Sequence, residues 1–153
     1  MEQEAGKSGR FVDASEQVIG ACIEVHRHLG PGLLESAYHE CLRYELRLRG
    51  LKYVSEIQVP VAYKGISLDC GYRLDFLIED SIILEIKAVE RLLPVHQAQV
   101  VTYLKLTGVN TGLLVNFNVA LIKQGLRRLT RKKNPSLPAF PASCSISDGC
   151  DEL

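Results

Sequence analysis

Apolar residues in the first third of the chain recur every three or four positions, which is the spacing of an amphipathic helix. This spacing predicts a first helix over residues 12–29, with Asp13 or Ser15 as its N-cap. A Gly-Pro-Gly segment at residues 30–32 then breaks the pattern, and a second helix is expected from there to about Arg49, before a glycine that is typical of a helix end.

The pattern changes to alternation after residue 52, which predicts β-strands. Apolar residues occupy odd positions from Tyr53 to Tyr63, and even positions from Leu68 to Ile78 and from Ile82 to Ala88. We expect the last two strands to form a hairpin with a three-residue turn at 79–81, because only that turn keeps one face wholly apolar. That face would consist of Leu74, Phe76, Ile78, Ile82, Leu84 and Ile86.

The second half of the chain predicts a helix, a strand and a last helix. Pro94 can start a helix that runs to about Thr107, residues 111–117 form a short apolar strand, and residues 121–133 are expected to form a basic helix. The order is helix, helix, three antiparallel strands, helix, strand, helix. Such an order is typical of an α/β fold in which helices flank a mixed sheet.

Length and composition indicate a single folded unit. The 153 residues predict one domain over residues 11–133, between a flexible leader at 1–10 and a disordered tail at 134–153 that is rich in Pro and Ser. No apolar run is long enough to cross a membrane. The five cysteines lack the spacing of a disulfide or zinc framework, which favours a cytoplasmic setting.

The formal net charge is zero, but the charge is unevenly distributed. Residues 1–133 carry 18 basic and 15 acidic residues, and six of the basic residues fall between Lys123 and Lys133. The predicted basic helix, with Lys123, Arg127 and Arg128, is either a solvated face or a surface that holds nucleic-acid phosphates.

Three charged residues gather on the polar face of the predicted hairpin. On the three-residue register Asp75 lies directly opposite Glu85, with Lys87 on the same face. Opposed carboxylates about 4.5–5.5 Å apart at Cβ repel each other unless a proton or a metal ion separates them. Mg²⁺ suits such a pair, and Lys87 could orient a water there. The alternative is a surface cluster in which Lys87 only neutralises the acids.

These residues resemble a known signature. Asp75, nine intervening residues and then Glu85-Ile86-Lys87 resemble the PD-(D/E)xK nuclease superfamily, with Leu74 where that signature has proline. The resemblance implies a restriction-endonuclease-like core of helix, three strands, helix and strand, preceded here by an extra N-terminal helix.

Two further segments carry the resemblance. Residues 32–38 resemble the signature of a family of small bacterial proteins called GxxExxY, and this implies that Glu35 is the upstream acid of the site. Gln99 and Tyr103 lie one helical turn apart and resemble the QxxxY element of RecB-like nucleases, with His96 on the same face.

The resemblance implies a Mg²⁺- or Mn²⁺-dependent nuclease that acts on DNA or RNA. Glu35, Asp75, Glu85 and the Ile86 carbonyl would hold metal, and Lys87 would position the attacking water. Gln99, supported by Tyr103, would orient the lysine or contact a phosphate. Residues proposed to contact nucleic acid are Arg73, His96, Lys123, Arg127 and Arg128. Two alternatives remain open: a non-catalytic module that binds nucleic acid or protein, and a structural subunit whose sheet face is an interface.

Overall fold

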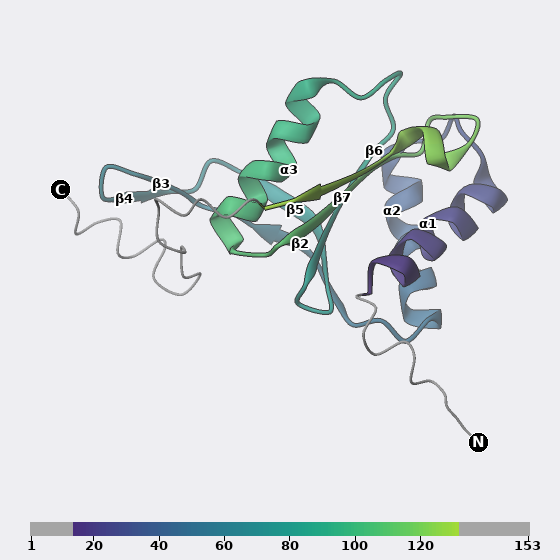
Figure 1. Cartoon of the computed structure of the whole chain (residues 1–153), viewed down its shortest axis with the longest axis horizontal. Helices are drawn as coiled ribbons and strands as arrows, with labels where there is room; N and C mark the ends of the chain where they lie inside the picture. The colour runs from purple at the N-terminus through teal and green to yellow at the C-terminus, as the bar shows by residue number, and fades with distance from the viewer. Residues whose placement is uncertain (1–13, 132–153) are drawn as a thin grey trace.

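A five-stranded mixed sheet forms the centre of the protein and separates two layers of helices (Figure 1). The computed structural model describes residues 14–131, so the predictions for the leader at 1–10 and the tail at 134–153 fall outside the described residues. The elements are α1 (Ser15–Leu29), α2 (Glu35–Leu48), β2 (Tyr53–Gln58), β3 (Val61–Tyr63), β4 (Ile66–Leu68), β5 (Arg73–Ile78), β6 (Ile82–Lys87), α3 (Pro94–Thr107), β7 (Thr111–Asn116), the 3₁₀ helix η2 (Ile122–Gly125) and β8 (Leu126–Thr130).

The strand order in the sheet is β2-β5-β6-β7-β8. Neighbouring strands are antiparallel except β6 and β7, which are parallel and are connected through α3. The helix α2, the strands β2, β5 and β6, the helix α3 and the strand β7 follow the predicted core order, and α1 is the extra N-terminal helix. The predicted α/β fold is therefore confirmed.

Two hydrophobic clusters lie on the two faces of the sheet. The larger packs α1 and α2 against one face, with Tyr38, Phe76 and Phe117 among its buried residues. The smaller packs α3 against the other face through Val100, Tyr103 and Leu104. Within residues 14–131, no helix is both long and apolar enough to span a membrane.

The predicted hairpin register is confirmed where β5 and β6 pair. Ile78 faces Ile82 and Phe76 faces Leu84, which leaves residues 79–81 as the turn. One residue departs from the prediction, because Leu74 packs in the α3 cluster and not with Phe76. Between these two residues the pairing of β2 with β5 skips one position, at which Glu56 has a φ of 56°. The side chains of Leu74 and Phe76 thus reach opposite layers across this break in the pairing.

The strands predicted at 53–63 and 68–78 are each broken into two. Pro60 follows the end of β2, Gly71 adopts a φ of 79°, and the segment between them forms the separate two-stranded sheet β3–β4. Proline cannot donate a ladder hydrogen bond, and glycine permits this left-handed turn. The Val59 N–H donates to the Tyr72 carbonyl at 2.8 Å and closes the base of this insertion.

The helix predicted at 121–133 is wrong. Residues 122–125 form η2 and residues 126–130 form β8, which pairs with β7. Leucines 126 and 129 pack against opposite clusters, as strand residues of odd separation do. The edge of β7 needs a partner for its backbone groups, and this tertiary requirement overrides the helical spacing.

The predicted N-cap of the first helix is also corrected. Ala14 occupies the cap position without a side-chain hydrogen bond, so Ser15 is the first helical residue, and Asp13 falls outside the described residues.

The packing of α3 on the sheet can be tested at Gly112 in β7. A Cβ there would lie 2.7 Å from Cγ1 of Val100, a stiff side chain in α3. Gly112→Ala should therefore lower the free energy of unfolding by about 1–3 kcal/mol, measured by denaturant titration. Gly20→Ala is the matched control, since its Cβ would meet only the flexible guanidinium of Arg49 and alanine favours a helix. Equal stabilities of Gly112→Ala and wild type would contradict this packing.

Candidate active site

The strands β5 and β6 stop pairing after Phe76 and Leu84, and two carboxylates occupy the position of the next ladder hydrogen bonds. The Asp75 N–H donates to Oε1 of Glu85 at 3.1 Å, and the Ile86 N–H donates to Oδ2 of Asp75 at 2.9 Å. Asp75 and Glu85 thus lie opposite each other as predicted, but carboxylate-to-backbone hydrogen bonds connect the strands here in place of backbone pairing. Both carboxylates are held between the strands by backbone donors.

Burial dominates the electrostatics of this pair. Glu85 is only 4% exposed, and burial together with the Asp75 carboxylate raises its pKa to about 8. Burial also raises the pKa of Asp75, although the Ile86 N–H, His39 and Lys87 oppose the shift. Two buried carboxyl groups in contact favour a shared proton or a bound cation. This burial argues against the alternative of a solvated surface cluster.

Lys87 is held by the helix α3. Its Nζ donates to Oε1 of Gln99 at 3.1 Å, and Nε2 of Gln99 donates to the Tyr103 hydroxyl at 3.2 Å. The Tyr103 hydroxyl in turn donates to the Arg73 carbonyl at 3.3 Å. This chain of hydrogen bonds connects the end of β6 to the start of β5 through α3, and it orients the lysine.

Glu35 approaches from the other helical layer as the first residue of α2. Partial burial and the Asp75 carboxylate raise its pKa, while Lys87 lowers it, so Glu35 shares the electrostatic field of the site. Tyr38 is a structural residue: its hydroxyl donates to the Gly30 carbonyl at 2.6 Å and accepts from the Leu33 N–H at 3.2 Å. These bonds tie the loop before α2 to the helix that carries Glu35.

Two residues that the sequence analysis did not select, His39 and Glu56, lie beside Asp75. Nε2 of His39 is 4.0 Å from Oδ1 of Asp75, and this buried nitrogen has no hydrogen-bond partner within residues 14–131. Glu56 occupies the skipped position opposite Asp75 and pairs with Arg43 at 3.3 Å. His39 follows Glu35 by one helical turn, and this spacing is the signal by which the sequence could have indicated it.

These side chains enclose a small polar pocket. Its volume is about 220 Å³, and its lining residues are Glu35, Ser36, His39, Glu40, Glu56 and Asp75. In the described part of the chain, no three His, Cys, Asp or Glu side chains form a ready-made metal cluster. One carboxylate oxygen of Asp75 and one of Glu85 instead accept hydrogen bonds from backbone N–H groups.

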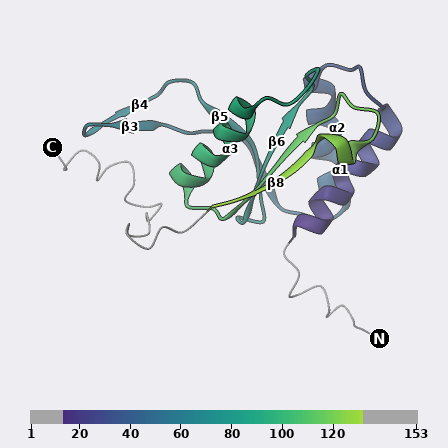
Figure 2. The same cartoon turned by 45° about the horizontal axis from the view of Figure 1, so that its top comes forward.

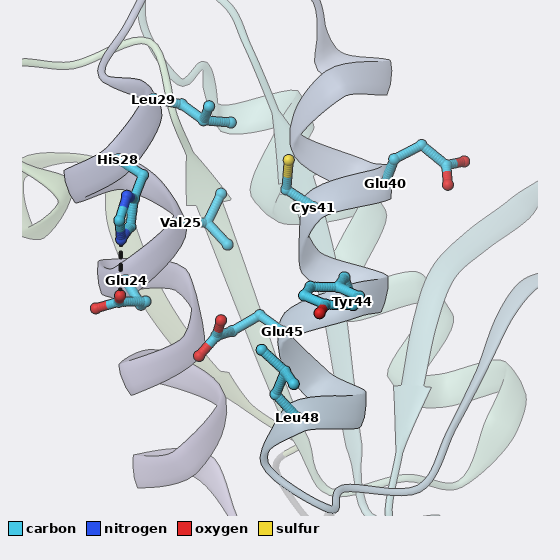
Figure 3. A pocket seen from close by; sticks show the side chains of 9 residues that line it. All are labelled: Glu24, Val25, His28, Leu29, Glu40, Cys41, Tyr44, Glu45 and Leu48. Atoms are coloured by element: carbon cyan, nitrogen blue, oxygen red, sulfur yellow. Dashed lines mark hydrogen bonds and ion pairs between the residues drawn. The ribbon is translucent and has the colours of Figure 1, made fainter.

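A larger groove of about 490 Å³ runs between α1 and α2 (Figure 3). Apolar residues such as Val25, Leu29 and Tyr44 line it. Its three acids are already paired: Glu24 binds Arg27 and His28, Glu40 binds Arg43, and Glu45 binds Arg49. We therefore assign no chemistry to this groove.

The predicted nucleic-acid contacts are not brought into one patch. Arg127 faces the α3 layer and donates to the backbone, whereas Arg128 reaches Ser15 of α1 at 2.7 Å on the other face. Lys123 lies exposed in η2, and the imidazole of His96 accepts from the Leu93 N–H at the start of α3. Arg73 is exposed in β5, two residues from Asp75.

The raised pKa of Glu85 predicts how stability depends on pH. The folded protein keeps this proton up to about pH 8, whereas the unfolded chain releases it near 4.5, so stability should fall as pH rises between these values. Glu85→Gln keeps an acceptor for the Asp75 N–H without a charge. In metal-free buffer its melting temperature should therefore fall less than that of wild type between pH 5 and pH 8. Glu90→Gln, which changes an exposed carboxylate, should follow wild type; parallel curves for all three proteins would contradict the burial argument.

Comparison with known proteins identifies the fold. No curated protein and no solved structure matches the chain. The family model described as the PD-(D/E)XK nuclease superfamily matches residues 12–129, well over half of the chain. This match shows the superfamily and does not by itself confirm the narrower GxxExxY family. Together with the sheet order and the arrangement of Asp75, Glu85 and Lys87, it shows that this chain belongs to the PD-(D/E)XK nuclease superfamily.

Proposed function

We propose that this protein is a divalent-metal-dependent nuclease that hydrolyses the phosphodiester backbone of DNA or RNA. The observation that carries the proposal is the buried pair of carboxylates in the gap between β5 and β6, beside a lysine held in place by Gln99. Superfamily membership supports a nuclease-like activity in general terms.

The chemistry of the donor set fits a hard divalent cation. Glu35, Asp75 and Glu85 offer carboxylate oxygens, and the Ile86 carbonyl is a fourth candidate ligand, a set suited to Mg²⁺ or Mn²⁺. The unpartnered Nε2 of His39 beside Asp75 is a sign that this pocket accommodates a further group. When bound, the ion would polarise the phosphodiester and lower the pKa of a coordinated water.

The remaining steps belong to side chains of the protein. Lys87 positions the water whose oxygen attacks phosphorus, and its ammonium stabilises the negative charge that develops as the P–O bond to the leaving group breaks. Gln99 holds the lysine, and Tyr103 holds Gln99. Arg73, His96, Lys123, Arg127 and Arg128 are proposed contacts for nucleic acid, on separate surfaces of the protein.

Two narrower proposals accompany this function. Glu35 stands at the first position of α2 and Tyr38 anchors the preceding loop, which supports assignment to the GxxExxY proteins within the superfamily.

Cys22, Cys41 and Cys70 are free thiols, which supports a reducing, cytoplasmic setting.

Substitution of Lys87 tests the catalytic proposal. Lys87→Ala should lower the cleavage rate at least about 100-fold, because the developing charge loses its donor, while metal binding persists. Asp75→Asn should lose both cleavage and metal binding. Cleavage is measured on a panel of single- and double-stranded DNA and RNA with Mg²⁺ or Mn²⁺, and metal binding by the rise in melting temperature that ligand linkage produces.

Lys105→Ala, which removes an exposed lysine of α3, is the matched control and should behave as wild type. Undiminished cleavage by Lys87→Ala would point to a contaminating nuclease. Nucleic-acid binding without any cleavage by wild type would favour the alternative of a non-catalytic binding module.

A further inference from the structure

The sheet formed by β3 and β4, together with the segments 59–60 and 69–72 that connect it to β2 and β5, extends away from the body of the protein (Figures 1 and 2). We call this hairpin, residues 59–72, the arm. Its strands pair Val61 with Leu68 and Tyr63 with Ile66, around a tight turn at Lys64 and Gly65 that has positive φ at both residues.

One face of the arm is apolar and open to solvent. Residues directly opposite each other in an antiparallel pair point to the same face, so Val61, Tyr63, Ile66 and Leu68 share one face. Tyr63 is 57% exposed and Ile66 is 53% exposed. A two-stranded hairpin is only marginally stable by itself, and an apolar patch exposed on one is typical of a binding surface.

The base of the arm adjoins the candidate active site. Tyr72, which is 48% exposed, precedes Asp75 by three residues, and the carbonyl of the intervening Arg73 accepts the hydrogen bond from Tyr103. A molecule bound along the arm towards its base therefore approaches the carboxylates of Asp75 and Glu85.

Exposed tyrosines lie beside cations, with Lys64 within the arm and Arg73 next to it, and this combination fits a nucleic acid better than a purely apolar partner. Lys64 lies 5.5 Å from the centre of the Tyr63 ring, and Arg73 is exposed at the base. Asp69 is the acid within this segment, and its carboxylate accepts hydrogen bonds from the Gly71 N–H and from Gln58. Tyrosine rings flanked by cations are the pairing that binds bases by stacking and phosphates by charge.

A nuclease with this site needs a surface outside the pocket to bind its substrate. The pocket beside Asp75 is lined by four carboxylates, which repel phosphate in the absence of metal. Arg127 and Arg128 lie on opposite faces of the sheet and form no common phosphate surface.

We propose that the arm binds unpaired bases of single-stranded nucleic acid on the face formed by Val61, Tyr63, Ile66 and Leu68, and so directs the adjoining phosphates towards Asp75 and Glu85. This inference rests on the proposed nuclease function and names its substrate class. Bases in a duplex are stacked on one another and leave no free face for Tyr63, so duplexes should bind more weakly.

The test measures binding of a fluorescent oligothymidylate of about 16 nucleotides by anisotropy, without divalent metal, so that no cleavage occurs. Tyr63→Ala should weaken binding about 5- to 150-fold, which corresponds to about 1–3 kcal/mol for one stacked base. Tyr63→Phe keeps the ring and should bind as wild type. Tyr44→Ala, at a tyrosine that is 60% exposed in the groove between α1 and α2, is the matched control and should also bind as wild type (Figure 3).

A second measurement does not depend on the folding of a variant. Ultraviolet crosslinking of wild type to an oligonucleotide that contains 5-iodouracil should place the adduct within residues 59–73. Adducts confined to other segments, equal affinities of Tyr63→Ala and wild type, or duplex binding as tight as single-strand binding would each overturn the proposal. So would light scattering that shows a wild-type dimer which Tyr63→Ala dissociates, because the apolar face would then be an interface between copies.

Bis(p-nitrophenyl) phosphate separates this inference from the proposed function, since it is a phosphodiester without bases. With Mn²⁺, wild type should cleave it and Lys87→Ala should not. If this diester and all nucleic acids stay intact while the binding results are as expected, the nuclease proposal fails and the arm remains a nucleic-acid-binding element. If the diester is cleaved but Tyr63→Ala binds oligothymidylate as wild type does, the arm proposal alone fails.

Discussion

The site depends on one local feature of the sheet: between β5 and β6, two backbone N–H groups donate to side-chain carboxylates and not to backbone carbonyls. A regular ladder at this position would have paired the backbones of Asp75 and Glu85 and pointed both side chains to one face. Instead each carboxylate accepts from an N–H of the neighbouring strand. Both buried carboxylates accept a hydrogen bond, but these bonds do not neutralise their two negative charges. Burial therefore raises the pKa of both groups. This arrangement, within an otherwise regular sheet, is the basis of the proposed cation site.

The two helical layers hold this centre from opposite sides. From one side, Gln99 and Tyr103 of α3 connect Lys87 to the backbone of Arg73. From the other side, α2 brings Glu35 and His39 towards Asp75, with the start of the helix anchored through the Tyr38 hydroxyl. Displacement of either helix would therefore alter the charge balance at the carboxylates as well as the hydrophobic packing.

Under the proposed function, catalysis and substrate binding would use separate surfaces. An acidic pocket suits a cation and repels a polyanion, so any surface that binds nucleic acid would lie outside it. Between β2 and β5 the fold inserts an arm with exposed tyrosine and lysine, adjoining the strand that carries Asp75. The strand β2, which neighbours β5, carries Glu56 at the unpaired position opposite Asp75, and the arm begins directly after β2.

Alternation along the chain was sufficient to predict the register of β5 and β6, and with it the meeting of Asp75 with Glu85, because a slip of one residue would bury the charged face. Helical spacing likewise predicted α1, α2 and α3, and a Gln–Tyr pair one turn apart. The spacing of leucines at 121–130 fits either a helix or a strand, and only the open edge of β7 decided for β8. The roles of His39 and Glu56 were also decided in three dimensions, since an imidazole on α2 and a carboxylate on β2 come to Asp75 only when helix and sheet pack together. Local patterns determine which face of an element is buried, whereas long-range contacts determine which buried faces meet.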